Sequence, residues 1–202
     1  MEIARAAAAL FVRQGLRATR AEDIAQAAGI APRTFYRYFA TKEEAVAPLY
    51  AAGAQRWIEA VRTAPAHLTL PEALEHAVHH TLTPGLGVSA ASWEWLRTLV
   101  RLADTSPALR KVWAEVCQTS EGALGEILVR RAEAEGKAAS YSPHLRFAAA
   151  VAGAAVRVAV ESWAATTTPP TGPDGPAALA LHNLRALRSF EWDESESPGG
   201  GR

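Results

Sequence analysis

Five residues in a short stretch near the start of the chain carry side chains suited to contact with nucleic acid. The stretch 31–39 contains no carboxylate but has two arginines, two tyrosines and a threonine, at Arg33, Thr34, Tyr36, Arg37 and Tyr38. Phe35 and Phe39 lie four positions apart, so they can share one face of a helix and leave the other five residues around its remaining surface. Guanidinium groups and aromatic hydroxyls donate hydrogen bonds to phosphates and base edges. The pattern predicts a short helix with an outward face that contacts DNA.

The residues just upstream predict the support that so short a helix requires, because an isolated helix of this length is unstable in water. Thr19 followed by Glu22 has the pattern of a capping box at a helix N-terminus. Gly29 can take the left-handed conformation that ends a helix, and Pro32 suits the first turn of the next. The inward face of the upstream helix is expected to hold Ile24, Ala27 and Ala28. The arrangement of helix, glycine turn and helix is that of a helix-turn-helix.

A second capping box follows the stretch 31–39. Thr41 and Glu44 have the spacing that starts a helix, which we expect to run to about residue 63. Lys42 would then lie at a helix N-terminus, where free backbone N–H groups and the helix dipole favour anions. We expect Lys42 to contact phosphate; the alternative is a solvated surface lysine.

Together these segments resemble the DNA-binding domain of the TetR family of bacterial transcriptional regulators (TetR/AcrR-like), over roughly residues 3–50. The resemblance rests on Thr19-Arg20-Ala21-Glu22-Asp23-Ile24-Ala25, Ala28-Gly29-Ile30, Arg33-Thr34-Phe35-Tyr36-Arg37-Tyr38-Phe39 and Thr41-Lys42-Glu43-Glu44. It implies a homodimeric regulator, most often a repressor, that binds a palindromic operator in double-stranded DNA and responds to a small molecule. Within it we assign base-edge contacts to Arg33, Thr34 and Arg37. Phosphate contacts are assigned to Arg20, Tyr36, Tyr38 and Lys42.

The rest of the chain reads as all-α. Besides the two helices of the motif and the segment 41–63, helices are expected over 3–15, 70–83, 89–103, 106–135, 144–165 and 175–190. These nine helices match the TetR architecture, in which three read DNA, the fourth connects, and five form a ligand-binding and dimerising body. We divide the chain into a DNA-binding domain at 1–46, a body at 47–190 and a disordered tail at 191–202. Leu10 and Phe11 are expected to pack beneath the helix-turn-helix.

Charge and cysteine content bound the remaining possibilities. Lysine and arginine balance aspartate and glutamate at 21 each, but residues 1–50 hold seven basic against five acidic residues. One cysteine, Cys117, excludes an intrachain disulfide framework and suits a reducing cytoplasm. The apolar run 147–160 contains Arg157 and is short for a membrane span. It is therefore expected to be a buried helix, with no membrane partner.

Small residues on the segment 144–165 suggest how two subunits would meet, because they let another helix approach closely. With a leucine stripe on the last helix, they give a predicted dimer interface of Ala148, Ala152, Ala155, Ala159, Leu184 and Leu187. The alternative is that these residues pack only within one subunit.

Tryptophans in the middle of the chain suggest an effector pocket, since large amphipathic rings suit an apolar wall with an occasional donor. The expected pocket residues are Trp93, Arg97, Arg101, Trp113, Cys117 and Trp163. Turned inward, Arg97 and Arg101 could neutralise an anionic effector, so an acyl-CoA-like or otherwise lipophilic molecule is expected. The tryptophans could equally be ordinary core residues, and the arginines solvated.

Other functions find less support in the sequence. His76, His79 and His80 share a helix face, yet a solvated or interface cluster is favoured over a metal site. The chain shows no glycine-rich phosphate loop and no nucleophile elbow, so an enzyme is not expected and no cofactor is implied. The alternative kept open is a helical interaction or architectural protein without small-molecule control.

Overall fold

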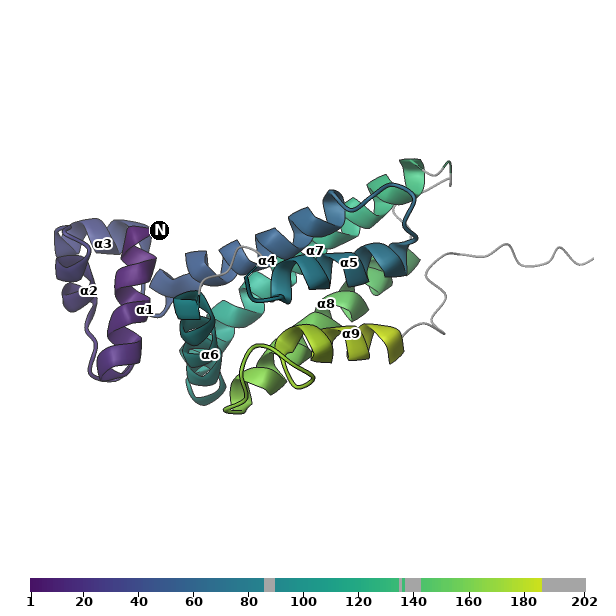
Figure 1. The fold of residues 1–202 in the computed structure, drawn as a ribbon. Coiled ribbons are helices and arrows are strands. Elements are labelled where there is room, and N and C mark those ends of the chain that lie inside the picture. Colours follow the sequence, from purple (N-terminus) through teal and green to yellow (C-terminus); the bar gives the residue numbers. More distant parts are fainter. Residues whose placement is uncertain (86–89, 135, 137–142, 187–202) are drawn as a thin grey trace, which may run out of the picture.

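A computed structural model describes residues 1–85, 90–134, 136 and 143–186 of the 202-residue chain (Figure 1). Over these residues the fold is all-α, with nine α-helices, one short 3₁₀ helix and no strand. The elements are α1 (Glu2–Gln14), α2 (Ala21–Ala27), α3 (Pro32–Tyr38), the 3₁₀ helix η1 (Glu44–Val46), α4 (Ala47–Arg62), α5 (Leu70–Leu82), α6 (Ala90–Thr105), α7 (Pro107–Ala134), α8 (Pro143–Ala165) and α9 (Pro176–Ala186). The predicted fold class is confirmed. The expected tail at 191–202 and the residue Leu187 lie outside the described residues.

The first three helices form the predicted helix-turn-helix with α1 behind it. Gly29 has a φ of +68° between α2 and α3, which is the left-handed turn that glycine adopts without strain. Phe35 is completely buried, and its ring centroid lies 5.5 Å from that of Phe39. Leu10 and Phe11 of α1 belong to the same cluster of buried apolar side chains, as expected.

Two local predictions about α2 are wrong. The helix is capped one residue later than expected, because the Asp23 carboxylate accepts a hydrogen bond of 2.8 Å from the backbone N–H of Arg20. Thr19 is instead completely buried, and its hydroxyl donates to the carbonyl of Gly15. The inward face of α2 holds Ala21, Ile24 and Ala25, whereas Ala27 is exposed and Ala28, at the C-cap, is half-buried.

The segment after α3 begins less regularly than a continuous helix from residue 41. Thr41 Oγ1 accepts from the backbone N–H of Glu44 at 3.3 Å, while the Glu44 carboxylate accepts from the N–H of Ala40 at 2.8 Å. A three-residue 3₁₀ turn follows, and the α-helix itself starts at Ala47 with Pro48 in its first turn. Lys42 therefore lies in a turn rather than at an α-helix N-terminus.

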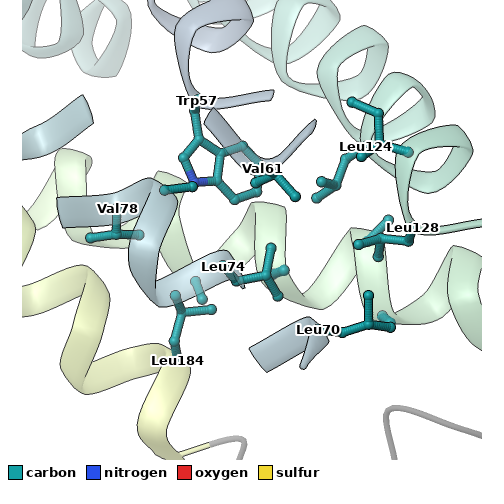
Figure 2. Close-up of a cluster of buried hydrophobic side chains, with 14 of the residues drawn as sticks. Trp57, Val61, Leu70, Leu74, Val78, Leu124, Leu128 and Leu184 are labelled. Atoms are coloured by element: carbon teal, nitrogen blue, oxygen red, sulfur yellow. The ribbon is translucent and has the colours of Figure 1, made fainter. Parts of the chain in front are cut away.

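The body is a bundle in which α4, α5, α7, α8 and α9 enclose one apolar core (Figure 2). Trp57 and Val61 of α4 meet Leu74 and Val78 of α5, and Leu128 of α7 closes the cluster. The most extensive contacts between helices are those of α8 with α9, of α4 with α7 and of α7 with α8. Helix α6 covers the end of this five-helix bundle that lies nearest α1 (Figure 1).

The small residues of α8 pack within one subunit, which corrects the predicted dimer interface. Buried apolar positions of the body core include Ala148, Ala152, Ala155, Ala159 and Leu184. Their small volume lets α7 and α9 approach α8 closely, so they present no surface to a second chain. The predicted buried helix is observed as α8; among the described helices it alone is long and apolar enough to cross a membrane, and it packs into this core.

A second apolar cluster joins the DNA-binding domain to the body. Phe11, Ile24 and Phe35 share it with Tyr50 of α4 and Leu99 of α6, together with the start of α7. Helices α1 and α6 are in contact, and the hydroxyl of Tyr50 donates to the carbonyl of Leu99 at 2.9 Å. A movement of α6 would therefore displace residues that are in direct contact with α1 and α4.

Candidate DNA interface and effector cavity

The outward side of α3 presents the side chains expected to contact DNA. Tyr36 and Tyr38 are 52% and 60% exposed, although aromatic residues are normally well covered. Arg33 and Arg37 are also exposed, and Thr34 is half-buried. The guanidinium of Arg37 lies 5.0 Å from the centroid of the Tyr38 ring and donates to its hydroxyl at 3.2 Å. Burial of Phe35 against α1 and α2 is what turns these residues outward.

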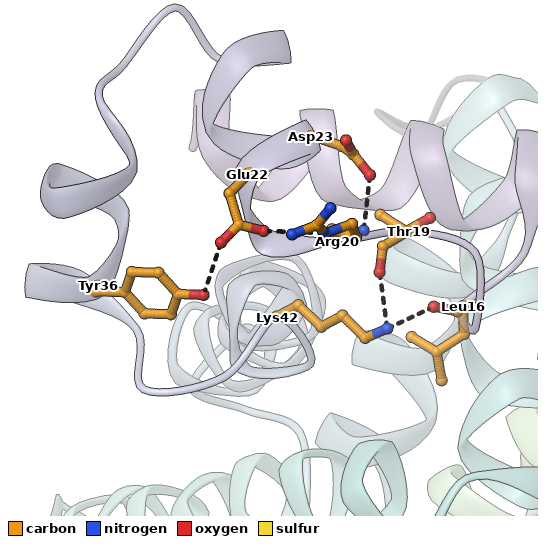
Figure 3. Close-up of polar contacts among 7 residues, drawn as sticks. All are labelled: Leu16, Thr19, Arg20, Glu22, Asp23, Tyr36 and Lys42. Atoms are coloured by element: carbon orange, nitrogen blue, oxygen red, sulfur yellow. Dashed lines mark hydrogen bonds and ion pairs between the residues drawn. The ribbon is translucent and has the colours of Figure 1, made fainter.

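Glu22 contacts two of the residues that are expected to bind DNA, Arg20 and Tyr36. The sequence pattern had assigned Glu22 only a capping role. Figure 3 shows its carboxylate between Arg20 and Tyr36: Oε2 lies 3.5 Å from Arg20 Nε, and Oε1 accepts from the Tyr36 hydroxyl at 3.4 Å. Glu22 and Tyr36 are fourteen positions apart, so no helical spacing in the sequence could indicate the contact. The carboxylate holds a cationic and a phenolic donor at the junction of α2 and α3.

Lys42 joins the turn after α3 to the loop between α1 and α2. Its Nζ donates to the carbonyls of Leu16 and Thr19, each at 2.7 Å (Figure 3). An ammonium has three donors, so these two contacts leave one for another acceptor. Lys42 is thus partly buried rather than a solvated lysine, and its expected phosphate contact stays a prediction.

A cavity of about 1410 Å³ lies in the body between α4, α6, α7 and α8, with edges from α1 and α5. Four of the six predicted pocket residues line it: Trp93, Arg101, Trp113 and Cys117. Arg97 and Trp163 do not line it. Further aromatic residues on its wall are Tyr50, Trp57 and Trp95, of which Tyr50 and Trp57 belong to α4 and were not expected there.

Arg97 and Arg101 serve the C-terminal end of α8 instead of an inward anion site. The Arg97 guanidinium lies 4.3 Å from the centroid of the Trp163 ring and donates to the carbonyl of Thr168. Arg101 donates from Nε to the carbonyl of Ala164 at 2.5 Å, and also to the carbonyl of Thr166. Helix C-termini leave carbonyls unpaired and carry a partial negative charge, which explains the contact of Arg101 with Ala164.

One wall of the cavity carries a polar cluster contributed by α7 and α8. Glu161 Oε1 accepts from the indole N–H of Trp113 at 2.7 Å, and Arg157 lies 3.0 Å from Glu161 Oε2. Burial raises the pKa of the nearby Cys117 thiol to about 11; Glu161 also raises it, while Arg157 opposes the shift. Burial likewise raises the pKa of the Tyr50 hydroxyl, whose ring centroid lies 5.0 Å from that of Trp113.

The histidines of α5 lie on the surface of the helix. The rings of His76 and His80 stack with centroids 6.3 Å apart, and both side chains are exposed. Over the described part of the chain, no three His, Cys, Asp or Glu side chains converge in a way that could hold a metal ion.

The fold and the α3 surface define a helix-turn-helix DNA-binding protein with a helical body, and comparison with known proteins gives the family. Residues 3–47 match the family model described as bacterial regulatory proteins, tetR family. The HTH-type transcriptional regulator TcmR of Streptomyces glaucescens is 30% identical over 167 residues, which cover 80% of this chain and 71% of the relative. The repressor KstR2 of Mycobacterium tuberculosis is 51% identical over 45 residues, 22% of each chain. This chain belongs to the TetR family and is a transcriptional regulator.

A solved structure extends the likeness over the whole chain. FadR of Thermus thermophilus, a TetR-family transcriptional repressor in complex with lauroyl-CoA, is 25% identical, with a TM-score of 0.58 and 98% of each chain covered. AlkX of Dietzia, a TetR-family repressor, is 19% identical with a TM-score of 0.59, and covers 94% of this chain and 96% of its own. At this sequence identity the similarity to AlkX supports the fold alone.

Proposed function

We propose that the protein is a homodimeric repressor that binds a palindromic operator through α3 and whose affinity for DNA is controlled by a small molecule in the body cavity. The observation that carries the proposal is the exposed, carboxylate-free face of α3, held outward by the buried Phe35. Such a face has little value for solubility alone, whereas it suits base edges and phosphates. We expect the protein to act in the cytoplasm.

Within this proposal Arg33, Thr34 and Arg37 read base edges, and Arg is the best guanine reader among the side chains. Four residues grip phosphates and set the register, namely Arg20, Tyr36, Tyr38 and Lys42. The Glu22 carboxylate supports this role, because it holds Arg20 and Tyr36 in place before DNA arrives.

A palindromic operator requires a dimer, because two DNA-binding domains, one from each subunit, must lie about one helical turn of DNA, roughly 34–36 Å, apart. With the small residues of α8 committed to the core, the outward side of the same helix is the better candidate surface. Phe147 and Val158 lie on it three helical turns apart and are 54% and 44% exposed, with Val151 between them. Large apolar side chains in line on a surface indicate a contact with another chain.

Control by an effector is supported by the cavity and by the apolar cluster that joins it to the DNA-binding domain. Leu99 and Tyr50 line the cavity and also pack in the cluster with Phe11 and Phe35. An effector that favours one position of α6 would change the spacing of the two DNA-binding domains in the dimer. A 100-fold change in affinity requires a preference of only about 2.7 kcal/mol between the two positions. An architectural protein without such control would need neither the cavity nor this connection.

A duplex-binding assay tests the proposal. The double variant Arg33→Ala with Tyr36→Ala should weaken binding to a palindrome upstream of the protein's own gene by about 2–4 kcal/mol, or roughly 30- to 1000-fold. Lys111→Ala is the matched control, because it removes one positive charge from an exposed position of α7 instead of from α3. Unchanged binding by the double variant would show that α3 does not enter the groove.

A further inference from the structure

The charged side chains along the cavity wall bear on what kind of molecule it can hold. The wall carries five arginines and three carboxylates: Arg5, Arg56, Arg101, Arg110 and Arg157, and Asp104, Glu121 and Glu161. Arg157 and Glu161 pair with each other, with Arg157 NH1 3.0 Å from Glu161 Oε2. Setting this pair aside leaves four arginines against two carboxylates, so the wall has an excess of positive charge. Such a cavity favours a ligand with negative charge.

Positive charge gathers at the end of the cavity nearest the DNA-binding domain. Arg5 belongs to α1 and Arg110 to the first turn of α7, and α6 contacts both of these helices. Ala103 and Leu109, the chain neighbours of Asp104 and Arg110, pack in the same apolar cluster as the buried side chains of α1. This end of the wall therefore carries three arginines, Arg5, Arg101 and Arg110, and one carboxylate, Asp104.

The three arginines differ in the donors that they keep for a ligand. Arg101 donates from Nε and NH2 to the carbonyls of Ala164 and Thr166, which fixes its position but leaves its charge in place. Arg110 donates from NH2 to the carbonyl of Asp104, and its Nε and NH1 bond to none of the described residues. Arg5 is exposed, and within the described part of the chain its side chain forms no hydrogen bond or ion pair. Arg5 and Arg110 can therefore bind an acid directly.

The rest of the wall suits an apolar molecule. Five aromatic rings from α4, α6 and α7 line it, those of Tyr50, Trp57, Trp93, Trp95 and Trp113. Rings of this size offer a large apolar surface to a ligand. The cavity thus combines an aromatic wall with a basic end, and a ligand that matches both parts is apolar along its body and acidic at one end.

We infer that the effector is an amphiphilic acid, with an apolar body against the aromatic rings and a carboxylate or phosphate group bound by Arg5 and Arg110. The inference rests on the proposed role of the cavity as the effector site. Arg5 belongs to the DNA-binding domain and Arg110 to the body, so the acid group connects the two domains directly. Binding then restrains α1 relative to α7. A contact of this kind, which depends on how the domains are arranged, is what lets a ligand shift the arrangement.

The first test compares two probes with the same ring system and chain but different head groups, pyrenebutyrate and pyrenebutanol. Binding to the full chain is measured by energy transfer from tryptophan to pyrene and by titration calorimetry. We expect pyrenebutyrate to bind about tenfold or more tightly than pyrenebutanol at neutral pH, because guanidinium groups pair with its carboxylate. Added salt should weaken the binding of pyrenebutyrate and leave that of pyrenebutanol unchanged.

Competition identifies the acid group. Dodecanoate and dodecyl phosphate should both displace pyrenebutyrate, and dodecanol should be about tenfold or more weaker as a competitor. The stronger of the two acids shows whether the site prefers a carboxylate or a phosphate. Displacement by dodecanol as effective as that by both acids contradicts the inference.

The variant Arg5→Ala tests the acid site and leaves the aromatic wall intact. It should weaken the binding of pyrenebutyrate about fivefold and that of pyrenebutanol less than about twofold. Arg13→Ala is the matched control, because Arg13 is exposed on the same helix and does not line this cavity. Operator affinity is measured for each protein with and without pyrenebutyrate. The ratio of the two values should move towards one in Arg5→Ala, and this ratio is independent of any direct contact of Arg5 with DNA.

The possible outcomes separate this inference from the proposed function. Equal or tighter binding of pyrenebutanol, with a change in operator affinity, overturns the inference and leaves the proposed function standing. An equal loss of affinity for both probes in Arg5→Ala overturns the placement of the acid group. Binding of neither probe, with operator affinity unaffected, overturns both the inference and the role of the cavity. The comparison on the unmodified chain needs no variant, so it stands even if Arg5→Ala does not fold.

Discussion

The outward face of α3 and the wall of the body cavity are built from the same kinds of side chain, arginines and large aromatic rings, but they use them differently. On α3 Arg33 and Arg37 are exposed to solvent, and both tyrosines are more than half exposed. In the cavity Arg101 and Arg157 are bound to carbonyls and to Glu161. Residue type therefore indicates chemistry only once it is known what else the side chain contacts.

The largest expected effect concerns the support beneath α3. Phe35→Ala removes a completely buried ring from the cluster shared by α1, α2 and α3, and should cost about 3–5 kcal/mol of stability and abolish operator binding. Leu74→Ala, equally buried but in the body core, is the matched control. Chemical unfolding of both variants, with a DNA-binding assay, should show operator binding lost in the first at temperatures where the second retains it.

The comparison extends to the outer side of α8, where an apolar surface takes the place of the charged one on α3. Val158→Asp should shift the protein from dimer to monomer, raising the dimer dissociation constant roughly 100-fold or more, about 2.7 kcal/mol. Light scattering after gel filtration measures the change. Val12→Asp, a substitution of the same type at an exposed position of α1, should leave the dimer intact. A dimeric Val158→Asp protein would place the interface elsewhere.

Lys42 has properties of both regions, since it is partly buried by protein acceptors and also lies beside the DNA-binding face. Lys42→Met should destabilise the protein by about 2 kcal/mol through the lost bonds to Leu16 and Thr19. Its third donor should also reach a phosphate, so the salt dependence of operator binding should fall by about one unit of slope. A drop in stability with an unchanged slope would leave Lys42 with a structural role alone.

Tyr50→Phe tests the connection between the two regions. The variant removes only the hydrogen bond to the carbonyl of Leu99, so a stability loss of about 1 kcal/mol is expected from thermal unfolding. The same change should reduce the effect of a bound effector on operator affinity, because α4 and α6 then move more independently. Full effector response in Tyr50→Phe would show that the connection runs through other contacts.

The smallest expected effect is on the reactivity of Cys117, which measures how enclosed the cavity is. Because burial raises the Cys117 pKa to about 11, the thiol should react slowly with alkylating agents at neutral pH and faster as the pH approaches that value. The neutral thiol is favoured in the folded state, so its contribution to stability is complete below the ordinary pKa of 9.0 and declines as the pH rises towards 11. Rapid alkylation at pH 7 would mean that the cavity is open to solvent.

How much could be predicted differs between the two regions for a physical reason. Around α3 the determinants are local: the spacing of Phe35 and Phe39 and the turn at Gly29 decide which side chains face outward. In the body the decisive contacts join residues far apart in the chain. Trp113 and Glu161 are separated by 48 positions and Arg101 and Ala164 by 63, distances over which helical periodicity carries no information.

The sequence by itself determined the all-α class, the helix-turn-helix, the outward residues of α3 and the family. Only the tertiary structure decided that the small residues of α8 pack inside the subunit, that Arg97 and Arg101 serve the end of α8, and that Arg157 is neutralised in the cavity. The reason is that a short helix anchored by one completely buried ring has one possible orientation, whereas a long amphipathic helix in a bundle has several faces, and its neighbours determine which of them is buried.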